Sequence, residues 1–193
     1  TDGSGTTNVQ VKANTSAGIS IVTYTGGSST PANSDSGDSF GHGLPVAPQV
    51  VICKKRTGSN SWPVYHASTS LGALVLDNYN GLDTSSYLFA KKHPSNSVVY
   101  LGNNPEINNS SDNYVAYCFA PVDGFSSFGL VEGNGLTNGP FIYTGFKPAF
   151  VMIKALYGYT AGSDIVANTS WVIHDNVRST YNANGAILAA DRS

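Results

Sequence analysis

The sequence is poor in charged residues. Only 11% of its 193 residues are Asp, Glu, Lys or Arg, and the formal net charge is −2. An ordinary soluble domain carries about 25% of such residues. Nucleic-acid backbones are held by clustered lysines and arginines, and no basic patch occurs here, which argues against nucleic-acid binding. Ser, Thr, Asn and Gly supply the polar surface instead.

The sequence also lacks long apolar runs and helical periodicity. No apolar run approaches the ~18 residues needed to cross a bilayer, and no secretory signal pattern is present, so we expect no membrane insertion. No window repeats its apolar residues with the 3.6-residue period of a helix. The 21 glycines and 11 tyrosines suit many short strands joined by tight turns. The chain starts at Thr1 without a methionine, so we expect a processed product or a fragment.

Cysteine is scarce as well. Cys53 and Cys118 are the two cysteines, and each lies within an apolar segment. Two cysteines do not make a disulfide scaffold. We expect a pair of small buried thiols. The alternative, a disulfide, requires the two segments to be neighbouring strands with matched geometry.

A seven-residue apolar segment occurs twice. The first copy runs from Pro48 to Lys54 and the second from Pro148 to Lys154. Each has the composition of a buried strand, with a proline at its start and a lysine at its end. Each is followed, after a loop, by a second apolar segment that begins with tryptophan, at 62–66 and 171–175. The recurrence predicts a duplicated module in an all-β chain.

The repeat divides the chain into three parts. Residues 1–18 are predicted to be an extended arm or linker, residues 19–123 a first β module, and residues 124–193 a second, truncated one. We predict further strands at 19–25, 73–77, 98–101 and 114–119, with a surface loop at 28–37. In the second module, 127–133 corresponds to 20–26, and 186–191 corresponds to 73–77.

The second module has no counterpart of the segments at 98–101 and 114–119. A sandwich that lacks two strands leaves an unpaired edge and uncovered apolar surface. Three solutions remain open. The natural chain continues past Ser193, a neighbouring subunit supplies the strands, or the second module packs onto the first as a half-module.

Catalytic signatures are missing. A glycosidase needs two carboxylates flanking a cleft, but most of the twelve acidic residues lie in predicted turns. No Gly-x-Ser-x-Gly elbow occurs. His66 and His174 follow the repeated tryptophans with an offset of one residue, which places them on opposite strand faces. His42, between two glycines, suits a tight turn. We therefore expect no enzyme, no catalytic residue and no cofactor.

Two pairs of acidic residues are candidates for a structural role or for metal binding. Asp77 and Asp191 end matching predicted strands, which suggests a structural role such as hydrogen bonding to a turn. Asp35 and Asp38 offer two carboxylates in one loop, but the glutamate and the spacing of a calcium-binding loop are missing. A solvated turn is therefore favoured there, and we expect no metal site.

Carbohydrate binding is a more specific hypothesis than catalysis or metal binding. Aromatic faces and Asn, Asp or Tyr side chains hold sugars, and the sequence is rich in these types. The tryptophans recur at the same place in the repeat, however, which is also what core residues do. Tyr157 and Tyr159 lie in the longer loop of the second module and are better placed for exposure. The candidate glycan-binding residues are Tyr157, Tyr159, Tyr79, Trp62 and Trp171, with Tyr65 as a further platform.

Several segments resemble a repeated module of tailed bacteriophages, common in phages of marine and freshwater bacteria. That module is usually described as a tail-fibre-like or virion structural protein. The resemblance covers about residues 18–182, although Val131 and Glu132 stand where the module usually has a Tyr-Thr pair. The matching segments are 18–26, 41–44, 46–48, 62–66, 114–120, 124–129 and 140–148.

The resemblance implies an antiparallel β-sandwich related to lectin-like jelly rolls, at the virion surface. It implies a homo-oligomer, a trimer or a polymer, that contacts other virion proteins and displays loops to a host-surface glycan. Two alternatives stay open. One is a purely structural capsid-decoration or filament subunit, completed by neighbouring chains. The other is a lectin-like module of a larger enzyme.

Overall fold

The computed structural model describes residues 5–27, 33–157, 170–178 and 187–191. All strand pairs in these residues are antiparallel, and no helix in them is long and apolar enough to cross a membrane. The predicted all-β class is confirmed. The strands are β1 (Val9–Asn14), β2 (Ile19–Thr25), β3 (Asp35–Gly41), β4 (Val50–Lys55), β5 (Pro63–His66), β6 (Leu74–Val75), β7 (Val98–Gly102), β8 (Asn113–Phe119), β9 (Phe150–Lys154), β10 (Trp171–Asp175) and β11 (Leu188–Ala189).

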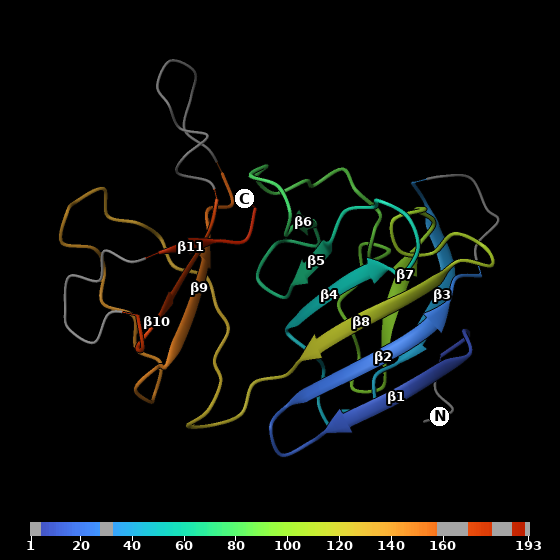
Figure 1. The fold of residues 1–193 in the computed structure, drawn as a ribbon, viewed down its shortest axis with the longest axis horizontal. Helices are drawn as coiled ribbons and strands as arrows, with labels where there is room; N and C mark the ends of the chain where they lie inside the picture. The colour runs from blue at the N-terminus through green and yellow to red at the C-terminus, as the bar shows by residue number, and fades with distance from the viewer. Residues whose placement is uncertain (1–4, 28–32, 158–169, 179–186, 192–193) are drawn as a thin grey trace.

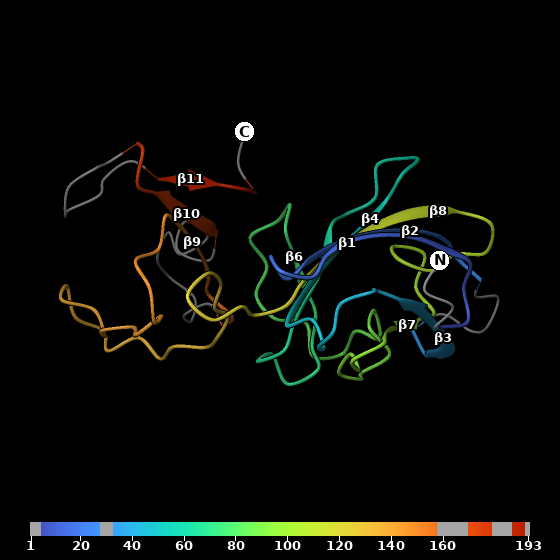
Figure 2. The same cartoon turned by 90° about the horizontal axis from the view of Figure 1, so that it is seen from below.

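The first module is a two-layer sandwich. Its larger sheet has six strands in the order β1-β2-β8-β4-β5-β6, and its smaller sheet pairs β3 with β7. Figure 2 shows the large sheet as one layer and β3 with β7 as the other. The main apolar cluster lies between them. It includes Val22, Phe40, Val51, Cys53, Tyr65, Val99, Leu101, Ile107, Tyr114, Ala116 and Cys118, all 1% exposed or less.

Strand β8 shows how the sequence produces this core. Tyr114, Ala116 and Cys118 are fully buried, while the residues between them are partly exposed. This alternation follows from the two-residue period of a strand, which sends successive side chains to opposite faces. Strand β8 lies between β2 and β4 and pairs along its length with both. It is therefore the central strand of the module.

Aromatic side chains join the two layers. Tyr24 of β2 stacks on Phe40 of β3 at 4.9 Å and on Tyr114 of β8 at 5.2 Å between ring centroids. The buried Tyr24 hydroxyl donates a hydrogen bond of 2.7 Å to the Ile107 carbonyl oxygen. A buried phenol needs such a partner, so this bond fixes the loop before β8 against the sheet.

The two cysteines are free thiols within this core. Cys53 and Cys118 lie on the neighbouring strands β4 and β8 and face the same layer. Burial raises the pKa of the Cys53 thiol to about 12 and raises that of Cys118 as well. The prediction of small buried thiols is confirmed.

Two segments differ from their predicted structure. Residues 9–14, assigned to the arm, form β1 and pair with β2 from Val9↔Tyr24 to Asn14↔Ile19. The predicted loop at 28–37 ends early, because β3 begins at Asp35 and passes through a bulge between Asp35 and Asp38. In β1, Val9 and Val11 alternate with polar residues and pack on the main core, a short period-two signal that the assignment to an arm overlooked. In β3 only Phe40 is a large apolar residue, so apolar periodicity does not reveal that strand.

The second module contains a three-stranded sheet in the order β11-β10-β9, coloured orange to red in Figure 1. Its pairing register matches that of β6-β5-β4. Val51 lies opposite Tyr65, and Val151 lies opposite His174. Val64 lies opposite Leu74, and Ile173 lies opposite Leu188. Residues 127–133, predicted to be a strand, form none; the missing neighbour in the second sheet explains this difference.

Candidate functional site

The two modules meet at the segment that follows β6. Trp171, at the start of β10, is 8% exposed and packs with Val64 and Leu74 of the first module. Its indole Nε1 donates a hydrogen bond of 2.7 Å to the Val75 carbonyl oxygen. Met152 and Leu156 extend this apolar cluster. The contact holds the second sheet against the edge of the first.

The repeated tryptophans are held in the same way in both modules. Asp77 accepts a hydrogen bond of 2.9 Å from the Trp62 backbone N–H, and Asp191 accepts one of 3.0 Å from that of Trp171. These bonds confirm the predicted structural role of the two aspartates. Lys54 lies 5.3 Å from the centre of the Trp62 ring and Lys154 lies 5.7 Å from that of Trp171, so each pair makes a cation–π contact.

The turn at 78–82 runs directly beside the end of β9. The Leu82 N–H donates a hydrogen bond of 2.7 Å to the Leu156 carbonyl oxygen, and Lys154 Nζ lies 3.5 Å from the Asn78 carbonyl oxygen. A Cβ atom at position 81 would come within 2.5 Å of the Leu156 carbonyl oxygen, so the close approach requires Gly81.

This approach brings two predicted sugar-binding tyrosines onto adjacent loops. Tyr79 is 49% exposed and Tyr157 is 73% exposed. Asn80, next to Tyr79 in the chain, is exposed, in a turn closed by the Asn78 side chain, which accepts the Asn80 N–H at 2.9 Å. We name Asp77, Tyr79, Asn80 and Tyr157 the junction surface. It combines aromatic faces with amide and carboxylate groups, the chemistry that holds a sugar ring.

The other predicted aromatic residues have different surroundings. Trp171 is buried, so its assignment as an exposed sugar platform is wrong. Tyr65 is 1% exposed and its hydroxyl pairs with His93 Nδ1 at 2.7 Å, so it also belongs to the core. Trp62 is half-buried beside Lys54. Tyr159 lies outside the described residues.

The sequence-based candidates left out several exposed aromatic residues, of which Phe141 and Tyr143 are the most exposed. Phe141 is 89% exposed and Tyr143 is 82% exposed. Both belong to the segment at 140–148, which the bacteriophage resemblance included without assigning it a function. Their exposure belongs to a broader feature of the second module, whose apolar residues lie largely at the surface.

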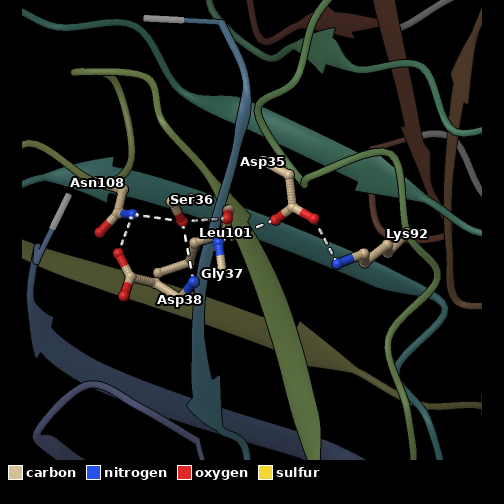
Figure 3. A network of polar contacts seen from close by, with 7 residues as sticks. All are labelled: Asp35, Ser36, Gly37, Asp38, Lys92, Leu101 and Asn108. Atoms are coloured by element: carbon tan, nitrogen blue, oxygen red, sulfur yellow. Dashed lines mark hydrogen bonds and ion pairs between the residues drawn. The ribbon is translucent and has the colours of Figure 1, made fainter. Parts of the chain in front are cut away.

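The paired aspartates of β3 form a structural network. Figure 3 shows the two carboxylates directed to opposite sides. Asp35 pairs with Lys92 at 2.5 Å, and Asp38 accepts a hydrogen bond of 2.9 Å from the Asn108 side chain. The Ser36 hydroxyl donates to the Leu101 carbonyl oxygen at 2.6 Å. The hydrogen bond from Lys92 lowers the pKa of the Asp35 carboxyl.

Asp35 and Asp38 lie in strand β3 on either side of a bulge, so the predicted solvated turn is wrong in form. Their carboxylates point to opposite sides. Across the residues with defined positions, no cluster of His, Cys, Asp or Glu has the geometry to hold a metal ion.

Asn108 is the centre of this network, and its replacement tests the structural interpretation. Asn108 is fully buried, donates to Asp38 and Ser36, and accepts the Gly27 N–H at 3.0 Å. We expect Asn108→Ala to lower the free energy of unfolding by about 1–3 kcal/mol, because it removes the three hydrogen bonds of a fully buried side chain.

Urea unfolding measures this change, with the exposed Asn109→Ala as the matched control. Added calcium should leave the melting temperature unchanged, since a bound ion would raise it. A calcium-dependent rise would contradict the structural interpretation.

The histidines make no catalytic constellation. His42 is fully buried, with Nε2 at 3.1 Å from the Ser95 carbonyl oxygen and Nδ1 accepting the Leu44 N–H at 3.2 Å. His66 lies opposite Val50, whereas His174 lies opposite Val151. The two therefore occupy opposite faces of equivalent strands, as the one-residue offset predicted.

Fold and site together define an all-β, antiparallel sandwich protein with a second small sheet docked at its edge. The chain belongs to the family described as Domain of unknown function (DUF7483), which matches residues 1–193. No curated protein and no solved structure gives a significant match.

Proposed function

We propose that this protein is a non-enzymatic structural subunit of a phage virion surface, in a tail fibre or head fibre, and that it binds a host-surface glycan. Two copies of one module form the scaffold. The observation that carries glycan binding is the placement of Tyr79 and Tyr157 on hydrogen-bonded loops, both exposed. The resemblance of residues 18–182 to the bacteriophage module supports the virion location.

A rigid support favours binding at this position. The turn at 78–82 is bonded to the Leu156 carbonyl oxygen, and the buried Trp171 anchors the sheet that carries Tyr157. Pre-positioned tyrosine faces lose little conformational entropy when a ligand binds. The proposed mechanism is therefore rigid display of an aromatic surface at the module junction.

Binding to an array of bacterial surface polysaccharides tests this proposal. We expect Tyr79→Ala and Tyr157→Ala each to weaken binding at least about tenfold, equal to about 1.4 kcal/mol. Both side chains are exposed, so the melting temperature should not change. Tyr143→Ala, equally exposed but outside the junction surface, is the control. The proposal fails if the wild type binds no glycan, or if Tyr143→Ala weakens binding as much.

The second candidate function is assembly, in which neighbouring chains complete the protein. The apolar surface of the second module favours it. Contiguous exposed apolar groups on soluble proteins usually mark interaction sites. The residues concerned are Leu130, Leu136, Phe141, Ile142, Tyr143, Phe150, Ile153 and Ile187, each at least 45% exposed.

A further inference from the structure

Among the described residues, the outer edge of strand β9 has no paired strand, whereas the same edge of its counterpart β4 is paired. In the first module, the outer edge of β4 pairs with β8, with Val51 opposite Cys118 and Cys53 opposite Ala116. In the second module, β9 is the last strand of its sheet. No described strand pairs with its outer edge. Such an edge presents a row of unpaired N–H and C=O groups to an added strand.

One face of β9 is also open. Val51 and Cys53 are fully buried in the main core, whereas Val151 and Ile153, at the matching register positions, are 37% and 45% exposed. The opposite face of β9 is covered in part, because Met152 packs into the apolar cluster at the module junction while Phe150 stays 59% exposed. The side that forms the core in the first module is therefore uncovered in the second.

The segment at 127–133 also lacks the neighbouring strand that its counterpart in the first module has. It corresponds in sequence to 20–26, where β2 pairs with the second edge of β8. Here it forms no strand, and Leu130 and Val131 are 66% and 44% exposed. The sequence therefore contains counterparts of both neighbours of β8, and no described strand of the second module is a counterpart of β8 itself.

We propose that the outer edge of β9, with Val151 and Ile153, binds one extended polypeptide segment as an added antiparallel strand. The segment has the chemistry of β8, with small apolar side chains at alternate positions facing the sheet. Main-chain hydrogen bonds supply affinity in such strand addition, and the alternate side chains supply specificity. With this segment bound, the second module has the same strand interface that β4 and β8 form in the first module.

The paired interface of the first module favours this occupant over β9 of a second copy. There, the added strand places Cys118 and Ala116 against the acceptor residues Val51 and Cys53. Val151 occupies the same register position in β9 as Val51 does in β4. A strand with small apolar side chains therefore repeats the arrangement of the first module, which a second β9 does not.

This inference rests on the proposed assembly function and identifies the edge of β9 as the surface through which the chain assembles. It is independent of glycan binding at the junction surface. A chain that assembles through another surface would keep the assembly function and lose this proposal.

The test is binding of a synthetic peptide to the full chain. The peptide comprises residues 112–120 with Cys118→Ser and a fluorescent label, and binding is followed by anisotropy. We expect saturable one-to-one binding, and protection of the β9 backbone amides from hydrogen exchange. A peptide of scrambled sequence should not bind.

Matched variants make the test specific to β9. Ile153 is 45% exposed on β9 and Ile21 is 44% exposed on β2. Ile153→Lys should weaken peptide binding at least tenfold, and Ile21→Lys should leave it unchanged. Circular dichroism checks that both variants stay folded.

Three results would overturn the proposal. The first is no peptide binding by the wild type, and the second is equal binding by Ile153→Lys. The third is self-association of the peptide-free chain, detected by light scattering, that Ile153→Lys abolishes and the peptide does not reverse. That last result would assign the β9 edge to a second copy.

Discussion

Replacement of Val51 by aspartate is expected to prevent folding, whereas the same replacement of Val151 is expected to be tolerated. The two valines occupy matching register positions in β4 and β9. Val51 is fully buried between two sheets, and Val151 is 37% exposed. An unpaired carboxylate in the core costs more than about 4 kcal/mol, a large part of the total stability of a domain. At Val151 the carboxylate stays in contact with water, and the cost is about 1 kcal/mol or less.

Thermal unfolding followed by far-ultraviolet circular dichroism measures the difference. Val51→Ala and Val151→Ala keep the comparison measurable if Val51→Asp does not accumulate as folded protein. Burial of a valine side chain is worth about 1.5–3 kcal/mol, so Val51→Ala should be clearly destabilised. Equal destabilisation by the two alanine variants would mean that the second module has a closed core in solution.

Replacement of Trp171 by alanine is expected to detach the second sheet without unfolding the first module. Trp171 is nearly buried at the junction and bonds to the Val75 carbonyl oxygen. Removal of a buried tryptophan costs about 3–5 kcal/mol. This cost falls on the contact between modules, because the main core lies on the other side of the large sheet and does not include Trp171.

Limited proteolysis together with thermal unfolding separates the two modules. Trp171→Ala should accelerate cleavage between residues 121 and 149 and leave the main unfolding transition in place. Trp62→Ala is the matched control, because it removes the equivalent, half-buried tryptophan, at an expected cost of about 1 kcal/mol. Unchanged proteolysis of Trp171→Ala would show that other contacts dock the second sheet.

The predicted strands illustrate what apolar pattern can and cannot reveal. Strand β8 was predicted almost to the residue, because Tyr114, Ala116 and Cys118 alternate with outward-facing residues. The sequence analysis assigned β1 to an arm, because its apolar alternation is limited to Val9 and Val11 within a polar segment, although both pack on the core. Residues 127–133 show the opposite difference. Their sequence resembles that of a strand, but they have no neighbouring strand to pair with and they form no strand.

The candidate site also shows which features the sequence predicts and which depend on the tertiary structure. Residue type and recurrence identified Tyr79, Tyr157 and the two tryptophans, but not which of them are exposed. Local sequence around Trp62 and Trp171 is similar, and their exposure differs because the junction covers Trp171 and leaves Trp62 half-buried. The adjacency of Tyr79 and Tyr157 depends on a contact between segments about 75 residues apart, which no local pattern contains.

The sequence by itself determined the all-β class, the repeated strand pair and the burial of the cysteines, whereas the structure showed that the two thiols are free. These follow from side-chain period and composition, which act locally along a strand. Only the tertiary structure decided which face of each repeated strand is covered and where the two modules touch. Coverage depends on which other strands are present to pack, and the similar sequences of β4 and β9 therefore have different surroundings.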